Sequence, residues 1–283
     1  MKIVISGANG FIGSNLLELA LSKGHEILAI RKSINSKTKI SLKKEPNWLN
    51  KNLSEININD LKNYDGLIHL AAHSANVPYD SLENCLQVNL FDSFRFLKKA
   101  HKAGIKNFIV AGSCFEYGIN GANYKFIPPN AALAPTQSYP ASKAAASIAF
   151  SQWAIENERK LSIMRIFQVY GEGESSKRLW PSLIRAAQNG DDFEMTKGEQ
   201  IRDFIDVKVL SEILLNECLN QDNKVKIRNI GSGETKSIAD FANEIWEKNK
   251  AKGKLIFGAK DYRDGEVFRY VPDIKSTYTL KNL

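Results

Sequence analysis

A glycine-rich turn near the start of the chain joins two segments of different periodicity. Residues 2–6 are a compact apolar run that predicts a buried strand, and a helical apolar stripe follows at Ile12, Leu16, Leu19 and Ala20. The backbone of such a turn can approach a pyrophosphate, and the helix N-terminus offers it free N–H groups and the positive end of its dipole. The turn therefore predicts a dinucleotide site made by Gly7, Asn9, Gly10, Phe11, Ile12 and Gly13.

Strands and helices alternate from the first residue to about residue 167. Further strands are expected at residues 26–30, 66–72, 107–112 and 161–167, with long helices at 81–101 and 140–158. This alternation predicts an α/β fold built on a doubly wound parallel Rossmann sheet, and the less regular last third predicts a smaller C-terminal lobe. We expect residues 1–167, with 203–230 returning to them, to form the dinucleotide-binding domain, and residues 168–202 and 231–283 to form the lobe.

The ends of the predicted strands carry the next candidate residues, because ligands of such sheets lie beyond the carboxyl ends of the strands. The second strand ends at Arg31, Lys32 and Ser33, where a cation accommodates the 2′-phosphate of NADP(H) and an acid would bind the ribose of NAD(H). Arg31 therefore favours NADP(H), with NAD(H) possible if this arginine is only a surface residue. Nearer the adenine we expect Asn57 and Ile58, at the end of a third strand. Small residues let a cofactor lie against the next strand end, at Leu70, Ala71 and Ala72.

The segment from Ser138 to Lys143 carries a tyrosine and a lysine at helical spacing. Tyr139 and Lys143 are four residues apart, and Pro140 suits the first position of a helix. An ammonium beside a phenol favours the phenolate, so we expect the pKa of Tyr139 to fall from its usual value of about 10. Such a tyrosine can pass protons to and from a sugar hydroxyl or carbonyl. The spacing alone would equally fit a surface pair.

Composition excludes several other classes of protein. The net charge of +8 is spread along the chain without a long basic block or a nucleic-acid motif, so we expect no nucleic-acid partner. Three widely spaced cysteines and four histidines without paired spacing predict neither a disulfide framework nor a metal site, which favours the cytoplasm. No apolar run of about 18 residues predicts a membrane span.

Together these motifs resemble the extended short-chain dehydrogenases/reductases, in the branch that acts on nucleotide-sugars. The resemblance covers nearly the full length. It rests on Gly7-x-x-Gly10-x-x-Gly13, His69-Leu70-Ala71-Ala72, Ser113 four residues before Tyr117-Gly118, Tyr139-x-x-x-Lys143, and Arg202-Asp203-Phe204. The resemblance implies an NAD(P)-dependent enzyme whose substrate is a nucleotide-diphosphate sugar, bound in the C-terminal lobe.

The resemblance also implies roles for individual residues. Tyr139 would be the catalytic acid/base, Lys143 would lower its pKa and hold the nicotinamide ribose, and Ser113 would hydrogen-bond the sugar oxygen at the reacting carbon. Asn89 would lie near the cofactor. The substrate-binding residues would be Ser113, Gln168, Arg202 and Arg263, with two qualifications. Gln168 stands where the family more often has Asn, and Arg263 would equally fit a structural salt bridge.

Departures from the family pattern narrow the expected activity. The 4,6-dehydratases of the family carry Asp-Glu directly after the catalytic hydroxyl residue, where this chain has Cys114-Phe115, so dehydration is disfavoured. Arg31 favours an NADPH-dependent reductase of a 4-keto-6-deoxy nucleotide-sugar, as in deoxysugar and surface polysaccharide biosynthesis. A 4-epimerase with tightly bound NAD(P) is the alternative. A dinucleotide sensor without activity is disfavoured, because Ser113, Tyr139 and Lys143 are all present.

The resemblance further implies a homodimer. In this family the helices that correspond to residues 81–103 and 140–158 form a four-helix dimer interface. Phe94, Phe150 and Trp153 would serve this interface or, alternatively, belong to the core.

Overall fold

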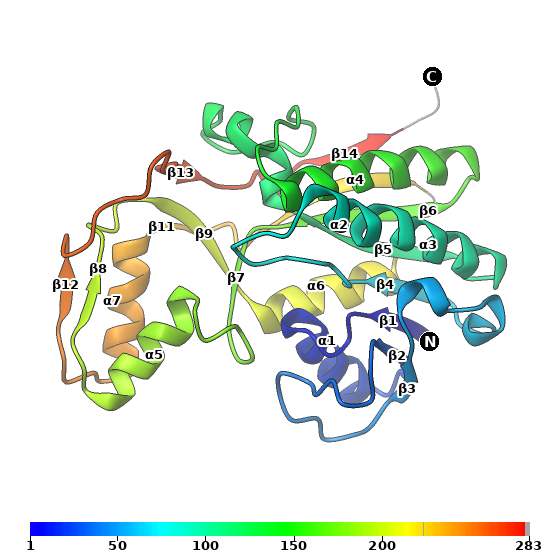
Figure 1. Cartoon of the computed structure of the whole chain (residues 1–283), viewed down its shortest axis with the longest axis horizontal. Helices are drawn as coiled ribbons and strands as arrows, with labels where there is room; N and C mark the ends of the chain where they lie inside the picture. Colours follow the sequence, from blue (N-terminus) through cyan, green and yellow to red (C-terminus); the bar gives the residue numbers. More distant parts are fainter. Residues whose placement is uncertain (223, 281–283) are drawn as a thin grey trace.

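A computed structural model describes residues 1–222 and 224–280 (Figure 1). Its centre is an eight-stranded sheet in the order β14-β10-β6-β5-β4-β1-β2-β3, in which only β14 runs antiparallel to its neighbour. The strands are β1 (Lys2–Ser6), β2 (Glu26–Arg31), β3 (Asn47–Asn50), β4 (Gly66–His69), β5 (Asn107–Ser113), β6 (Lys160–Ile166), β10 (Val225–Ile230) and β14 (Thr277–Leu280). The expected doubly wound parallel Rossmann sheet is therefore confirmed.

Helices cover both faces of this sheet (Figure 1). One face packs on α1 (Phe11–Ser22) and α6 (Val207–Leu219). The other packs on a continuous helical run and on α4 (Ser138–Glu156), the run being α2 (Leu82–Leu86), η3 (Gln87–Asp92) and α3 (Ser93–Lys102). Successive residues of a strand face opposite sides, so Ile3 and Ile5 pack towards α1 while Val4 packs towards α3. Because the sheet is buried on both faces, the sequences of its central strands are unbroken apolar runs.

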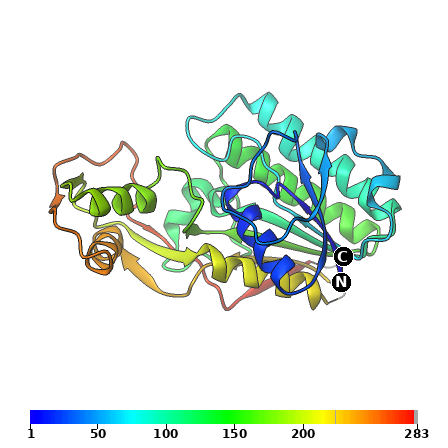
Figure 2. The same ribbon diagram turned by 90° about the horizontal axis from the view of Figure 1, so that it is seen from below.

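The smaller lobe lies beyond one end of the large sheet (Figures 1 and 2). Four strands form one of its sheets, namely β7 (Gln168–Tyr170), β9 (Ile201–Asp206), β11 (Thr235–Ser237) and β13 (Arg269–Tyr270). A second sheet pairs β8 (Phe193–Met195) with β12 (Leu255–Phe257). Two helices, α5 (Leu179–Asn189) and α7 (Ile238–Lys248), pack together around Leu183, Phe241 and Trp246. Three 3₁₀-helical segments lie between strands and helices of the larger domain, namely η1 (Leu53–Glu55), η2 (Ile58–Leu61) and η4 (Cys114–Asn123).

The structure corrects two details of the expected elements and locates three aromatic residues for which an interface and the core were both considered. The segment 81–101 is not a uniform α-helix, because η3 is a π-helical turn in its middle. The helix expected from Pro140 begins two residues earlier, so Pro140 is its third residue, where its missing N–H still costs no hydrogen bond. Of the aromatic residues considered for a dimer interface, Phe150 and Trp153 belong to the core, and Phe94 stacks on Phe150.

No helix in the described part of the chain is long and apolar enough to cross a membrane.

Candidate active site

The glycine turn packs tightly against the end of β4. Gly7 has a φ of +69°, and a Cβ added to it would lie 2.7 Å from the backbone nitrogen of Ala71. A Cβ on Gly13 would lie 2.1 Å from the carbonyl oxygen of Gly7. Helix α1 follows with Gly10 as its N-cap, no side-chain cap and no acidic residue in its first turn. Its first N–H groups are therefore available to an anion, and the close backbone packing fits a dinucleotide pyrophosphate.

Arg31, the last residue of β2, is held in place by the neighbouring strand β3. Its Nε donates to Oδ1 of Asn50 at 2.8 Å, and its guanidinium lies 4.1 Å from the ring centroid of Trp48. A third contact runs from Nη1 to the carbonyl oxygen of Ser36 at 3.2 Å. The two exposed residues that follow, Lys32 and Ser33, continue the same strand end. The stack on Trp48 orients a planar cation at the edge of the predicted dinucleotide site.

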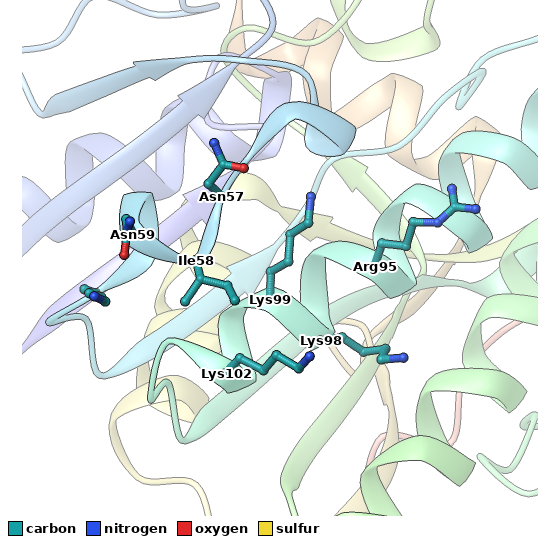
Figure 3. Close-up of a pocket in the computed structure, with 8 residues that line it drawn as sticks. Asn57, Ile58, Asn59, Arg95, Lys98, Lys99 and Lys102 are labelled. Carbon is teal, nitrogen blue, oxygen red and sulfur yellow. The ribbon is translucent and has the colours of Figure 1, made fainter.

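Asn57 and Ile58 do not lie at the end of the third strand as expected, and their position near the adenine stays a prediction. The third strand ends at Asn50, seven residues before Asn57, because the chain turns through η1 directly after β3. Asn57 and Ile58 instead line a pocket against α3, together with Asn59, Lys62, Arg95, Lys98, Lys99 and Lys102 (Figure 3). The residues that follow the end of β3 are Lys51 and Asn52, which sequence reasoning missed because β3 is only four residues long.

Leu70, Ala71 and Ala72 follow the end of β4 and lie beside the glycine turn, as the backbone contact with Gly7 shows. The preceding histidine, His69, joins three elements of this region. Its Nδ1 lies 2.6 Å from Oγ of Ser6 and its Nε2 lies 3.0 Å from Oγ of Ser93. Complete burial lowers the pKa of His69 to about 3, so the ring is neutral near pH 7. His69 is thus a buried hydrogen-bonding link between β1, β4 and α3.

Asn89 lies in the π-helical turn η3 and connects two parts of the site. Its Oδ1 accepts from the backbone N–H of His73 at 2.7 Å, and its Nδ2 donates to the carbonyl oxygen of His73 at 3.1 Å. The same Nδ2 donates to Oγ of Ser142 at 2.9 Å. Asn89 therefore fastens the segment after β4 to the first turns of α4, next to Lys143.

Ser113, Tyr139 and Lys143 come together beyond the carboxyl end of β5. Ser113 ends that strand and accepts a hydrogen bond from the backbone N–H of Phe115 at 3.2 Å, which leaves its own hydroxyl hydrogen free to donate. All three side chains are buried. Lys143 donates from Nζ to the carbonyl oxygen of Ala111 at 2.6 Å, so its ammonium group is fixed beside the strand that carries Ser113.

The expected fall in the pKa of Tyr139 is wrong. Burial raises this pKa above its usual value, and the negative charge of Glu116 raises it further, while hydrogen bonding by the Ser113 side chain opposes the rise. The ammonium group of Lys143 points to Ala111 and is itself buried, which lowers the pKa of the lysine. The loss of water around the phenol thus outweighs the neighbouring cation, and Tyr139 is protonated near neutral pH.

The two residues after Ser113 offer no carboxyl group for acid–base chemistry. Burial raises the pKa of the Cys114 thiol to about 12, so it stays protonated near neutral pH, and the side chain of Phe115 is partly exposed. The next residue, Glu116, turns inward to a buried ion pair with Arg165. The Tyr139 phenol is therefore the proton donor that the residues after Ser113 do not provide.

Apart from Ser113, the residues expected to bind the substrate lie in the smaller lobe. Arg202 donates from Nη2 to Oε1 of Glu266 at 3.1 Å and to the carbonyl oxygen of Val267 at 2.7 Å. The charge of Arg202 opposes the rise that burial causes in the pKa of the Cys114 thiol, the residue after Ser113. Arg263 is exposed, and Gln168 begins β7, where it pairs with Phe204 of β9.

Sequence reasoning also missed Tyr79. Its ring lies 5.4 Å from that of Tyr139, centroid to centroid, and is half-buried. The loop that carries it is tied to α4, because Oγ of Ser138 donates to the carbonyl oxygen of Asp80 at 2.6 Å. No signal short of the tertiary contact identifies Tyr79, since the loop from residue 73 to residue 81 has no recognisable motif.

Comparisons with known proteins agree with this geometry. The sequence profile of the NAD dependent epimerase/dehydratase family matches residues 3–231. The dTDP-6-deoxy-L-talose 4-dehydrogenase (NAD(+)) of Aggregatibacter actinomycetemcomitans is 27% identical over 93% of this chain and 97% of its own length. The CDP-abequose synthase of Salmonella muenchen is 26% identical over 94% of this chain and 87% of its own length.

The fold matches that of solved nucleotide-sugar enzymes. The UDP-N-acetylglucosamine 4-epimerase of Methanobrevibacter ruminantium superposes with a TM-score of 0.87 at 22% identity, over 97% of this chain and 89% of its own. The match to the family profile spans most of the chain and includes the glycine turn, Ser113, Tyr139 and Lys143. The chain therefore belongs to the NAD dependent epimerase/dehydratase family, whose members modify nucleotide-sugars.

Proposed function

We propose that this protein is an NADPH-dependent reductase of a 4-keto-6-deoxy nucleotide-sugar, with Tyr139 as the proton donor. The observation that carries the proposal is the buried group of Ser113, Tyr139 and Lys143, which has a protonated phenol and no carboxyl group at residues 114 and 115. A reduction needs a proton donor at the carbonyl oxygen, whereas a dehydration needs an acid or base that eliminates water.

Each member of the group has a distinct task in this reaction. When bound, the nicotinamide cofactor supplies the hydride that reaches the keto carbon. The Tyr139 phenol gives its proton to the keto oxygen, and the hydroxyl of Ser113 donates a hydrogen bond that stabilises the forming alkoxide. Lys143 holds the ribose hydroxyls of the cofactor and stabilises the tyrosinate that proton transfer leaves behind. A proton from solvent then restores the phenol.

The remaining residues of the site bind the two ligands. We assign the pyrophosphate to the glycine turn from Gly7 to Gly13, the 2′-phosphate to Arg31 with Lys32 and Ser33, and the nicotinamide side to Leu70, Ala71, Ala72 and Asn89. Arg202 and Arg263 would bind the diphosphate of the sugar nucleotide, since arginine pairs well with phosphate oxygens, and Gln168 would contact the sugar. We assign the dinucleotide to residues 1–167 and 207–230, and the sugar nucleotide to residues 168–206 and 231–276. These bounds correct the expected ones, because β9 belongs to the sheet of the smaller lobe and β14 to the large sheet.

Two observations support reduction at carbon 4. The Aggregatibacter relative is named a 4-dehydrogenase of a dTDP-6-deoxysugar, and the reverse of such an oxidation is the reduction of a 4-keto group. The raised pKa of Tyr139 also leaves the phenol in the protonated form that a reduction consumes. Deoxysugar and surface polysaccharide biosynthesis in the cytoplasm is the setting that we propose for this reaction.

The purified protein is expected to oxidise NADPH when it is given a nucleotide-linked 4-keto-6-deoxyhexose. The measurement is the loss of reduced nicotinamide absorbance across a panel of such sugars, with product analysis at carbon 4. Nucleotide-sugars without a keto group serve as the control, because they offer no acceptor for the hydride.

A 4-epimerase with tightly bound NAD(P) is the second candidate, because the solved structure from Methanobrevibacter ruminantium belongs to a 4-epimerase. Denaturing the purified protein separates the two. Oxidised NAD released in a one-to-one ratio, with interconversion of 4-epimers and no net use of NADPH, would assign the epimerase and contradict the reductase.

Substitution of Arg31 tests the preference for NADP(H). Arg31→Ala is expected to weaken NADPH binding by about ten-fold, the size of one lost charge-assisted hydrogen bond, and to leave NADH binding unchanged. Calorimetric titration measures both affinities. The matched control is Lys32→Ala, which removes the exposed neighbouring cation. If the unaltered protein binds NADH at least as tightly as NADPH, the assignment of Arg31 is wrong.

We also propose a homodimer. Leu82, Phe91 and Ile148 are large apolar side chains that stay exposed on α2, η3 and α4, the helices that the family resemblance assigns to an interface. We assign the interface to these three side chains and not to Phe150 and Trp153, which are buried in the core.

A further inference from the structure

A buried ion pair lies directly behind the catalytic group. Glu116 and Arg165 have side chains that are 0% and 3% exposed, and Nε of the arginine donates to Oε2 of the glutamate at 2.8 Å. Removing two charges from water is costly unless other hydrogen bonds compensate. The other hydrogen bonds of Glu116 and Arg165 therefore indicate which parts of the structure this ion pair holds together.

The carboxylate of Glu116 joins two elements that carry the catalytic group. Its Oε1 accepts from the backbone N–H of Ser113 at 2.7 Å, at the end of β5. Its Oε2 accepts from Oγ of Ser147 at 2.8 Å, one turn along α4 from Lys143. One carboxylate thus links the strand end that presents the Ser113 hydroxyl to the helix that presents Tyr139.

The arginine fixes the other side of the same network. Its Nη1 donates to the phenol oxygen of Tyr117 at 2.9 Å and to the carbonyl oxygen of Pro129 at 3.0 Å. Arg165 lies on β6, paired with Gly112 of β5, and a Cβ on this glycine would come within 2.9 Å of Oε1 of Glu116. The carboxylate is therefore confined by close packing as well as by hydrogen bonds.

Glu116 also acts on the catalytic group through its charge. It raises the pKa of Tyr139, and it raises the pKa of Lys143 against the lowering effect of burial. Both effects favour the proton-carrying forms of the two side chains, which are the forms that a reduction requires.

We propose that Glu116 is a positioning residue for proton transfer, which holds the Ser113 hydroxyl and the Tyr139 phenol in one geometry by tying β5 to α4. The proposal rests on the proposed reductase function. It assigns Glu116 no contact with substrate or cofactor, because its carboxylate is fully buried and occupied by Ser113, Ser147 and Arg165.

Ser147→Ala tests the tie without breaking the ion pair, since Glu116 keeps its contacts with Arg165 and the Ser113 amide. The variant is expected to lower kcat by about ten-fold, as for one lost hydrogen bond to a charged group, with KM for both substrates changed by less than about two-fold. The matched control is Ser151→Ala, because Ser151 lies one turn further along α4, is equally buried, and has an Oγ without a hydrogen-bond partner in the structure. Equal kcat values for the two variants would overturn the proposal.

A pH profile provides the second readout. Glu116→Gln removes the charge that raises the pKa of Tyr139, so the alkaline decline of kcat is expected at lower pH than in the unaltered protein. If Glu116 had a purely structural role, the substitution would lower activity without shifting the pH of this alkaline decline. An unshifted decline therefore contradicts the proposal. If Glu116→Gln fails to fold, the kcat values of Ser147→Ala and Ser151→Ala test the proposal without it.

Hydrogen exchange distinguishes two failures: that Glu116 does not link β5 to α4, and that the protein is not a reductase. The Ser113 amide is expected to exchange faster in Ser147→Ala than in Ser151→Ala, measured by NMR on the folded protein. If the unaltered protein reduces no nucleotide-sugar, the proposed function is wrong whatever this exchange shows. If it does reduce one and the exchange rates of the two variants agree, the function stands and the positioning role is wrong.

Discussion

Tyr139→Phe is expected to lower kcat by about 10²–10⁴-fold, the usual contribution of a positioned acid–base group, while dinucleotide binding stays intact. The substitution removes only the phenol oxygen, and the ring keeps its packing against Tyr79 at 5.4 Å. Neither Cys114 nor Glu116 can replace this proton donor, because burial raises the pKa of the Cys114 thiol to about 12 and Glu116 is paired with Arg165. Steady-state NADPH oxidation gives kcat, and calorimetric titration gives the affinity for the dinucleotide.

The matched control for this variant is Tyr79→Phe. It removes the phenol oxygen of a half-buried residue whose ring packs at a tilt against that of Tyr139, so any loss through altered ring packing appears in both variants. We expect kcat to change by less than about three-fold in Tyr79→Phe, within the range of substitutions that remove no essential contact. Unchanged turnover in Tyr139→Phe would rule out the proposed mechanism.

The meeting of Ser113, Tyr139 and Lys143 at one edge of the sheet was predictable, because topology decides it. Ser113 ends one strand, and Tyr139 and Lys143 begin the helix before the next. In a parallel sheet all such points lie at one edge, whatever the details of packing. The periodicity of the apolar residues was enough to establish this order, so no tertiary contact had to be known.

The pKa of Tyr139 and the place of Asn57 were not predictable from sequence. Besides burial, the charges of Glu116, Tyr79 and Cys114 raise the pKa of the phenol, and no spacing in the sequence connects these three residues to Tyr139. Strand β3 is short and polar at both ends, so its limits depend on pairing with β2 rather than on its own pattern. Sequence reasoning therefore located the end of the third strand seven residues too late.

The glycine turn offers the second large effect. Gly13→Ala is expected to destabilise the protein by about 3 kcal/mol or more, and to weaken dinucleotide binding, because its Cβ would lie 2.1 Å from the carbonyl oxygen of Gly7 and 2.9 Å from Cα of Ala8. Both contacts are with backbone, so no side chain can move aside and the turn itself must shift. Chemical denaturation measures the free energy of unfolding, and calorimetric titration measures the binding.

Gly10→Ala is the matched variant, because it places the same methyl group three residues earlier in the same turn. Gly10 has a φ of −75° that alanine adopts freely, and its Cβ would meet only the carbonyl oxygen of Gly7, at 3.2 Å. The free energy of unfolding should therefore change by less than about 1 kcal/mol.

Dinucleotide binding should still weaken in Gly10→Ala, because the second glycine of such a turn lets the backbone approach the pyrophosphate. A Gly10→Ala variant that binds the dinucleotide as tightly as the unaltered protein would show that the pyrophosphate lies elsewhere, while equal destabilisation by the two variants would contradict the packing argument for Gly13.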